Sequence, residues 1–178
     1  MGKKVFLKKY NRKKLEWLHD ARWFIIVFVL GFILLRFVIG FSYISGDSMS
    51  PTLNDGESVM YLRIHPAYKV GDIVALKVPS GDYYVKRIVA LPGDTVDIRR
   101  NTVYVNGEVE ALDVEEGITK RQKGTVVYPY KVSDGYYFTL GDNRKVSVDS
   151  RYYGEVTKGR IKGKIIFKFK GIHGLVVR

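Results

Sequence analysis

Residues 71–91 read GDIVALKVPSGDYYVKRIVAL, and this stretch predicts how most of the chain folds. It contains two short runs rich in valine, isoleucine and tyrosine, each bounded by glycine, proline or aspartate. That composition is typical of β-strands separated by turns. The pair Gly81-Asp82 lies between the two runs and has the residue types of a turn. We therefore expect two strands joined by a turn.

The same pattern recurs on both sides of this stretch. Asn106-Gly107 lies between VYV and EVE and is a strong signal for a two-residue hairpin loop. Residues 110–125 are polar and of mixed charge, so we expect an exposed loop there that carries no chemistry. The expected fold class is mainly β, with further strands in residues 57–64, 94–100, 101–109, 125–132, 135–140 and 162–170.

Residues 23–41 read WFIIVFVLGFILLRFVIGF and contain Arg36 as their one charged side chain. At about 1.5 Å per residue, a helix of this length spans the roughly 30 Å of a bilayer's hydrocarbon layer. A core helix of a globular protein should show a polar face, which this segment lacks. A cleaved export signal would be shorter and end in a small-x-small site, to which Gly40-Phe41-Ser42 is only weakly similar. We therefore predict a single transmembrane helix that stays uncleaved.

The net charge of the chain is +12, which by itself allows nucleic acid or an anionic membrane as a partner. Residues 1–22 hold eight lysines and arginines against Glu16 and Asp20, so much of the excess precedes the apolar segment. The positive-inside rule then places the N-terminus in the cytoplasm. We expect three parts, a basic cytoplasmic tail (1–22), a membrane anchor (23–41) and an extracytoplasmic β-domain (42–178), in contact with membrane lipid and not with nucleic acid.

The chain has no cysteine, which excludes disulfides, thiol nucleophiles and cysteine-based zinc sites. Its three histidines, His19, His65 and His173, form no close pair in the sequence. We therefore expect no metal and no cofactor. Hydrolytic chemistry would have to proceed without a histidine cluster.

Three polar stretches are candidates for such chemistry. Ser48 follows a glycine and precedes Pro51, so it lies on a constrained turn that suits a nucleophile beside an oxyanion hole, or a plain linker. Lys86 alternates with Tyr84 and Ile88 on one face of its strand; if that face is buried, the pKa of the lysine falls and its neutral amine can act as a base. The other interpretation is a solvated strand lysine. Residues 141–151, GDNRKVSVDSR, are either a surface loop or a polar site beside the core.

Together these stretches resemble the type I signal peptidases in content and order. The family's S-M-x-P-T-L box matches residues 48–53, its G-D-I-V box matches 71–74, its Y-x-K-R and L-P-G-D box matches 84–94, and its G-D-N-R-x-x-S-x-D-S-R box matches 141–151. The resemblance implies a membrane-anchored serine endopeptidase of signal-peptidase fold. Such an enzyme removes signal peptides from exported preproteins after small-x-small sites, at the outer face of the cytoplasmic membrane.

The resemblance also implies roles for particular residues. Ser48 corresponds to the nucleophile, Lys86 to its general base and Ser147 to the serine that orients the lysine amine. The Ser48 N–H corresponds to one oxyanion donor, whereas Gly46 stands where some members carry a serine that supplies the second, so that donor stays open. The remaining correspondence is a structural ion-pair group of Asp149, Arg151 and Arg87.

Substrate binding in the family implies a peptide added as a β-strand between residues 42–47 and 82–86. Our candidates for shallow pockets along it are Ile44, Leu53 and Val85, although apolar residues on such strands also form core. The main alternative function is a non-catalytic signal-peptidase-like factor for surface-protein assembly, which should have lost the serine or the lysine. A self-cleaving repressor would need an N-terminal DNA-binding domain, and a basic nucleic-acid-binding β-domain would leave the apolar segment unexplained.

Overall fold

A computed structural model of the chain describes residues 17, 21–64, 67–110, 119–124 and 126–170. The three histidines and most of the basic tail lie outside these ranges. The chain divides into two compact units, residues 1–39 and 40–178. Each unit is described by itself below.

Among its described residues, the first unit contains one helix long and apolar enough to cross a membrane, Ala21–Val38. Its last turn, Leu34–Val38, is π-helical and includes Arg36. The side chains of this segment are almost all exposed, as expected of a helix that has no protein core to cover it. The helix ends before Ile39, three residues earlier than the apolar composition predicted.

Residues Ile39–Tyr43 form strand β1 and not the end of the anchor. β1 pairs with strand β2, Glu57–Leu62. Gly40 explains part of this arrangement, because a β-carbon at that position would overlap the ring of Tyr61. Composition alone could not separate helix from strand here, since large apolar residues suit both a membrane helix and a sheet edge.

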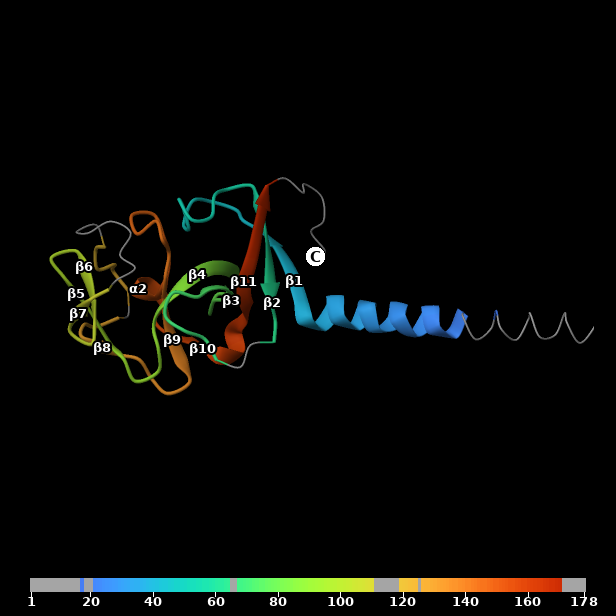
Figure 1. Cartoon of the computed structure of the whole chain (residues 1–178). Helices are drawn as coiled ribbons and strands as arrows, with labels where there is room; N and C mark the ends of the chain where they lie inside the picture. The colour runs from blue at the N-terminus through green and yellow to red at the C-terminus, as the bar shows by residue number, and fades with distance from the viewer. Residues whose placement is uncertain (1–16, 18–20, 65–66, 111–118, 125, 171–178) are drawn as a thin grey trace, which may run out of the picture. The chain divides into compact units, whose positions relative to one another are not determined.

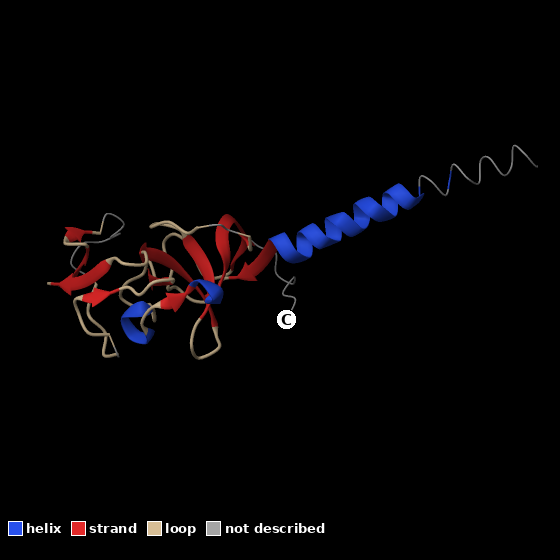
Figure 2. Cartoon of the chain, turned by 90° about the horizontal axis from the view of Figure 1, so that it is seen from below, coloured by secondary structure: helices blue, strands red, loops and turns tan. Residues whose placement is uncertain are grey.

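Two antiparallel sheets make up the second unit (Figure 1). The larger sheet has the strand order β1-β2-β11-β3-β4-β9-β10 and the smaller one has the order β7-β6-β5-β8. Outside the N-terminal helix, the helical segments among the described residues are the short α2, Ser150–Tyr153, and η2, Lys158–Arg160 (Figure 2). The remaining strands are β3 Ile73–Lys77, β4 Tyr83–Ala90, β5 Thr95–Arg99, β6 Thr102–Val105, β7 Glu108–Val109, β8 Tyr130–Lys131, β9 Tyr136–Leu140, β10 Val156–Thr157 and β11 Ile161–Lys170.

The mainly β fold class is confirmed, and so are the local signals behind it. β3 and β4 pair in antiparallel fashion, with Ala75 opposite Val85. Val105 lies opposite Glu108, and Asn106 and Gly107 between them have φ values of 54° and 88°, as a two-residue hairpin turn of this kind requires. Within the predicted strand 125–132, the described residues 126–132 form only the two-residue strand β8, next to Pro129, which has no N–H to donate to a ladder.

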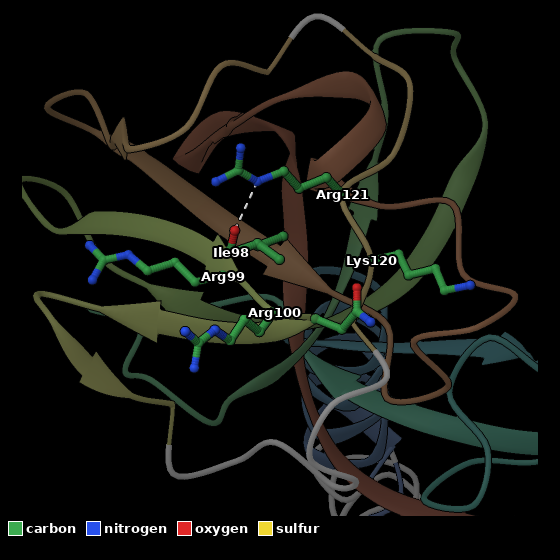
Figure 3. A pocket seen from close by; sticks show the side chains of 6 residues that line it. Ile98, Arg99, Arg100, Lys120 and Arg121 are labelled. Carbon is green, nitrogen blue, oxygen red and sulfur yellow. Dashed lines mark hydrogen bonds between the residues drawn. The ribbon is translucent and has the colours of Figure 1, made fainter.

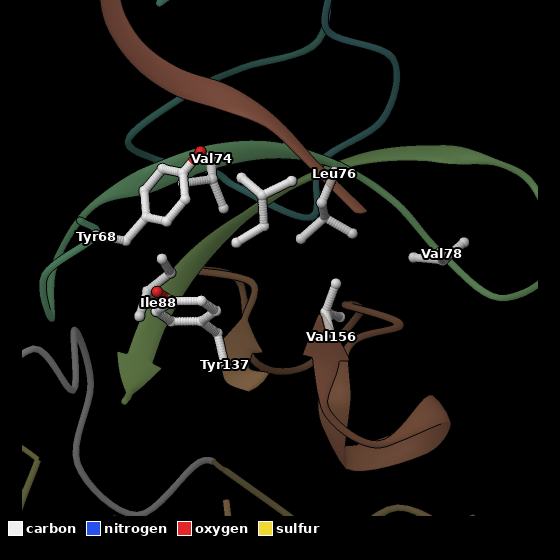
Figure 4. Packing of buried hydrophobic residues seen from close by; sticks show 8 residues of the cluster. Tyr68, Val74, Leu76, Val78, Ile88, Tyr137 and Val156 are labelled. Atoms are coloured by element: carbon white, nitrogen blue, oxygen red, sulfur yellow. The ribbon is translucent and has the colours of Figure 1, made fainter. Parts of the chain in front are cut away.

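Three buried apolar clusters hold the second unit together. Figure 4 shows the first, in which Ile88 of β4 packs with residues of β3, β9, β10 and β11. The second lies between β4, β9 and the smaller sheet and includes Val96 and Phe138. The third consists of Ile44, Met49, Leu53 and Val59, with Val85 packed against it. The third cluster matters most for the site, because it anchors the turn that contains Ser48.

Candidate active site

Ser48 and Lys86 are in contact. Lys86 Nζ donates a hydrogen bond of 2.7 Å to Ser48 Oγ, although 38 positions separate the two residues in the sequence. Lys86 lies in β4 and is 2% exposed, on the same buried face as Ile88. The interpretation of Lys86 as a solvated strand lysine is therefore wrong.

Burial changes the acid–base properties of the lysine. Desolvation lowers the pKa of the Lys86 ammonium from 10.5 to about 8, since the charged form loses its water. The carboxylate of Asp149 opposes this shift and the guanidinium of Arg151 adds to it, with a smaller opposing effect from Asp142. The ring of Tyr84 also lies beneath the amine, 5.2 Å from Nζ to the centroid. A lysine with this pKa has a substantial neutral fraction near neutral pH and can accept a proton from a hydroxyl group.

The turn that contains Ser48 is held by its own backbone and by the core. Ser50 N–H donates to the Asp47 carbonyl over 3.1 Å, and Leu53 N–H donates to the Met49 carbonyl over 2.9 Å. The side chains of Met49 and Leu53 are buried in the third cluster, whereas Ser48 itself is half-buried. The buried neighbours Met49 and Leu53 thus hold the turn against the core, while Ser48 itself stays partly exposed.

Gly46 stands at the position where the sequence leaves the second oxyanion donor open. Its N–H donates a hydrogen bond of 2.7 Å to Asp55 Oδ1, so this amide already has an acceptor. Its φ of 89° is in the left-handed region that favours glycine. This hydrogen bond argues against Gly46 as the second oxyanion donor, and the Ser48 N–H stays the candidate for the first.

Ser147 lies next to the Ser48 backbone but makes no hydrogen bond to Lys86. Its side chain is buried, and its Oγ has no hydrogen-bond partner among the described residues. Gly141 fits between the two serines, because a β-carbon there would overlap the Ser147 hydroxyl and come within 2.5 Å of the Ser48 carbonyl oxygen. The lysine-orienting role of Ser147 stays a prediction.

The expected ion-pair group consists of two separate pairs. Asp149 accepts from Arg151 Nε over 2.8 Å, with both side chains buried, and also from the Arg151 N–H as the N-cap of α2. Arg87 pairs instead with Asp142, over 2.7 Å from Nε and 2.6 Å from one terminal nitrogen. The polar side chains of Asp142, Arg144, Ser147, Asp149 and Arg151 are therefore buried beside the core, whereas Lys145, Val146 and Val148 of the same segment are exposed.

Comparison with known proteins shows which family the chain belongs to. The family model described as "Signal peptidase, peptidase S26" matches residues 15–170. The chain is 34% identical to signal peptidase IB of Staphylococcus aureus, over 89% of this chain and 91% of that protein. It is 36% identical to signal peptidase I of Bacillus amyloliquefaciens, over 91% and 92% respectively. A crystal structure of a signal peptidase I from Enterococcus faecalis is similar with a TM-score of 0.46 and 30% identity, covering 58% of this chain and all of that one.

The chain belongs to the signal peptidase family, peptidase S26. Its resemblance to type I signal peptidases is thereby confirmed, as is its assignment as a peptidase of this type. The non-catalytic alternative is not favoured. It predicts the loss of Ser48 or Lys86, and the structure brings both into hydrogen-bond contact.

Other residues of this signal peptidase site had no assigned role in the sequence. Asp142 and Arg144 stand inside the G-D-N-R box, which could have drawn attention to them. Arg144 donates to Glu110 over 2.9 Å, and both side chains are buried. Gln122 donates to the Ser147 carbonyl over 2.8 Å. The expectation of an exposed loop at 110–125 was wrong for Glu110 and Thr119, which are buried, whereas Lys120, Arg121, Lys123 and Gly124 are exposed as expected. Residues 111–118 and 125 lie outside the described residues.

The three pocket candidates lie together in the third cluster. Ile44 and Leu53 are buried and Val85 is half-buried, so their side chains form core in this structure. Their role in lining substrate pockets stays a prediction.

A cavity of about 540 Å³ lies elsewhere, at the end of the β5–β6 hairpin (Figure 3). Its lining is basic and includes Arg99, Arg100, Lys120 and Arg121, but neither Ser48 nor Lys86. Arg99 and Arg121 both pair with Asp97. This cavity therefore does not belong to the serine–lysine site. Among the described residues, no group of three or more histidine, cysteine or acidic side chains is arranged to hold a metal.

Proposed function

We propose that this chain is a membrane-anchored serine endopeptidase that removes N-terminal signal peptides from exported preproteins, with Ser48 as nucleophile and Lys86 as general base. The observation that carries the proposal is the 2.7 Å contact between a hydroxyl and a buried amine, in a chain of the signal peptidase family. No cofactor or metal enters the mechanism.

In the first step, neutral Lys86 accepts the proton of the Ser48 hydroxyl while Oγ attacks the carbonyl carbon of the scissile peptide bond. The backbone N–H of Ser48 would donate to the oxyanion that forms. Collapse of the tetrahedral intermediate breaks the C–N bond, and the Lys86 ammonium returns the proton to the leaving amine. The signal peptide is then held as an ester on Ser48.

In the second step, Lys86 removes a proton from a water molecule that attacks this ester. The protonated amine then returns the proton to Ser48 Oγ as the C–O bond breaks, which regenerates the enzyme. Ser147, whose buried hydroxyl has no partner among the described residues, is our candidate to orient the amine between these steps.

The substrate should bind as an extended strand between residues 42–47 and 82–86. A strand bound in this way gains main-chain hydrogen bonds, and every second side chain meets the protein surface. The apolar surface formed by Ile44, Leu53 and Val85 would then accept small residues, which accounts for cleavage after small-x-small sites.

The apolar helix accounts for the location. An anchor formed by the apolar helix that ends at Val38, preceded by the basic tail, would hold the N-terminus in the cytoplasm and the β-domain outside. Ser48 follows Val38 by ten positions, so the nucleophile would lie close to the outer membrane surface, where a signal peptide emerges.

Incubation of the detergent-solubilised full chain with a peptide spanning an Ala-x-Ala site tests the proposed activity. Mass spectrometry should find one cut after the second alanine, and none with Ser48→Ala or Lys86→Met. Ser133→Ala, a change of an exposed serine in the β8–β9 connection, is the matched control and should cleave like the wild type. Full activity of either dyad variant would exclude the mechanism.

The topology needs its own test. Because the chain has no cysteine, a single cysteine can be introduced at Lys3 or at Ser133 and labelled in intact cells with a membrane-impermeant maleimide. We expect labelling at position 133 alone before lysis and at both positions afterwards. Labelling of position 3 in intact cells would reverse the proposed orientation.

A further inference from the structure

Residues at both ends of the segment 110–125, which the sequence analysis predicted to be an exposed loop without chemistry, make hydrogen bonds with the loop 141–151. The described parts of the segment 110–125 are Glu110 on one side and residues 119–124 on the other, and we call Glu110 and residues 119–122 the flank residues. Glu110 is 5% exposed and Thr119 is fully buried, which is unusual for polar residues of a surface loop. Their contacts lead to the serine–lysine site.

The flank residues reach the start of the loop 141–151 through Arg144. One terminal nitrogen of this buried guanidinium donates to Glu110 over 2.9 Å, and the other donates to Thr119 Oγ1 over 3.2 Å. Its Nε donates to the carbonyl of Gly141 over 3.1 Å. Arg144 thus joins the flank residues to the glycine that separates Ser48 from Ser147.

The flank residues also contact the middle of the loop 141–151, at the carbonyl of Ser147. This oxygen accepts 2.8 Å from Gln122 Nε2 and 3.2 Å from a terminal nitrogen of Arg151. Arg151 in turn donates to the Lys120 carbonyl over 3.3 Å. Because Arg151 belongs to the loop itself, Gln122 is, among the described residues, the side-chain donor that holds Ser147 from another segment.

Little room exists between this loop and the nucleophile. Asn143 N–H donates to the Ser48 carbonyl over 3.1 Å, and Gly141 fills the space between that carbonyl and the Ser147 hydroxyl. In a close-packed site, a displacement of Ser147 is transmitted to its neighbours. The position of the Ser147 backbone therefore bears on Ser48 and on the neighbouring Lys86.

We propose that Gln122 is a positioning residue for the serine–lysine site: its amide fixes the Ser147 carbonyl, and thereby the Ser147 hydroxyl, against the Ser48 backbone. Glu110 and Thr119 support the start of the same loop through Arg144. This inference rests on the proposed function for its kinetic readout, and its test therefore includes a readout that does not need turnover.

Gln122→Met keeps the length of the side chain but removes the donor, whereas Gln122→Lys keeps a donor. We expect Gln122→Met to lower kcat about tenfold, the factor that corresponds to one hydrogen bond, with KM nearly unchanged. Gln122→Lys should recover most of the lost kcat. Lys123→Met, at the exposed neighbouring position, is the matched control and should cleave like the wild type.

The second readout is the titration of Lys86, followed by NMR of isotopically labelled lysine in the full chain. The charged groups that act on Lys86 are Asp149, Arg151 and Asp142, and none of them changes in Gln122→Met. A loosened loop admits water, so desolvation of the amine falls and the pKa of Lys86 rises. The acidic limb of the kcat/KM profile should move to higher pH by the same amount.

The outcomes separate the two proposals. If the pKa of Lys86 is shifted in Gln122→Met, the positioning role is supported, whether or not the chain cleaves signal peptides. If the wild-type chain cleaves no signal peptide, the proposed function is refuted. Normal kcat and an unshifted titration in Gln122→Met refute the positioning role and leave the function standing. A kcat loss that Gln122→Lys does not reverse, or that Lys123→Met shares, also refutes it.

Discussion

Arg87 donates two hydrogen bonds to Asp142, over 2.7 and 2.6 Å, and so ties the strand that contains Lys86 to the loop that contains Ser147. The Asp142 side chain is 1% exposed and that of Arg87 is 16% exposed. Arg87 also donates to the Gly71 carbonyl over 2.9 Å, which adds the G-D-I-V segment to the same connection. These three sequence boxes thus meet at Arg87, and the fourth joins them through the contact of Ser48 with Lys86.

Removing one partner of this pair should destabilise the fold. Asp142→Ala leaves the Arg87 guanidinium largely buried without its carboxylate, which typically costs about 3–5 kcal/mol in the free energy of unfolding. Urea unfolding of the solubilised chain, followed by circular dichroism, measures the change. Arg99→Ala breaks an ion pair whose arginine is 59% exposed and should cost under about 1 kcal/mol. Equal losses in the two variants would contradict the importance of burial.

Activity should rise with pH through the titration of Lys86. Burial lowers the pKa of this amine to about 8, and only the neutral form can accept the serine proton. Below pH 8, kcat/KM should therefore fall about tenfold per pH unit, and above it the profile should level off. A peptide without ionisable side chains near the cut separates this effect from substrate titration. A profile that is flat from pH 6 to pH 9 on this substrate would exclude a lysine base.

The same group should make stability depend on pH. Since the pKa of Lys86 is lower in the folded state than in the unfolded state, the unfolded chain binds more protons between pH 8 and 10.5, and stability rises with pH across that window. Lys86→Met removes the buried charge and this dependence. At pH 7 it should raise the free energy of unfolding by up to about 3 kcal/mol, while activity is lost. We would compare urea midpoints at pH 7 and pH 10; a variant that keeps the wild-type slope would contradict the assignment.

Gly141 should tolerate no side chain. In Gly141→Ala the new methyl group would overlap the Ser147 hydroxyl and crowd the Ser48 carbonyl, so we expect a loss of kcat on the order of a hundredfold or more, as displacement of a reacting group commonly causes. Gly159→Ala is the matched control, because a β-carbon there meets nothing within 4 Å. Both variants are assayed with the same Ala-x-Ala peptide. Normal turnover by Gly141→Ala would show that the loop and the Ser48 turn can move apart without consequence.

The sequence by itself determined the fold class, the apolar helix and the chemistry-bearing residues. Strand composition and turn residues are local properties, so β3, β4 and the Asn106-Gly107 hairpin could be predicted from neighbouring residues. Alternation along β4 placed Lys86 on the face of Ile88, and burial of that face lowers the pKa of the lysine. The motif order then led to Ser48.

Tertiary structure alone decided which of these groups meet. β11, the last strand, lies between β2 and β3, and Ile39–Tyr43 joins the sheet instead of extending the helix. The 2.7 Å contact of Lys86 with Ser48 and the hydrogen bond of Gln122 to Ser147 join segments that are 38 and 25 positions apart in the sequence. Periodicity reports which side of a strand is apolar, whereas hydrogen-bond partners depend on how separate segments pack. A polar glutamine that is half-buried against a carbonyl therefore looks, in sequence, like any residue of a surface loop.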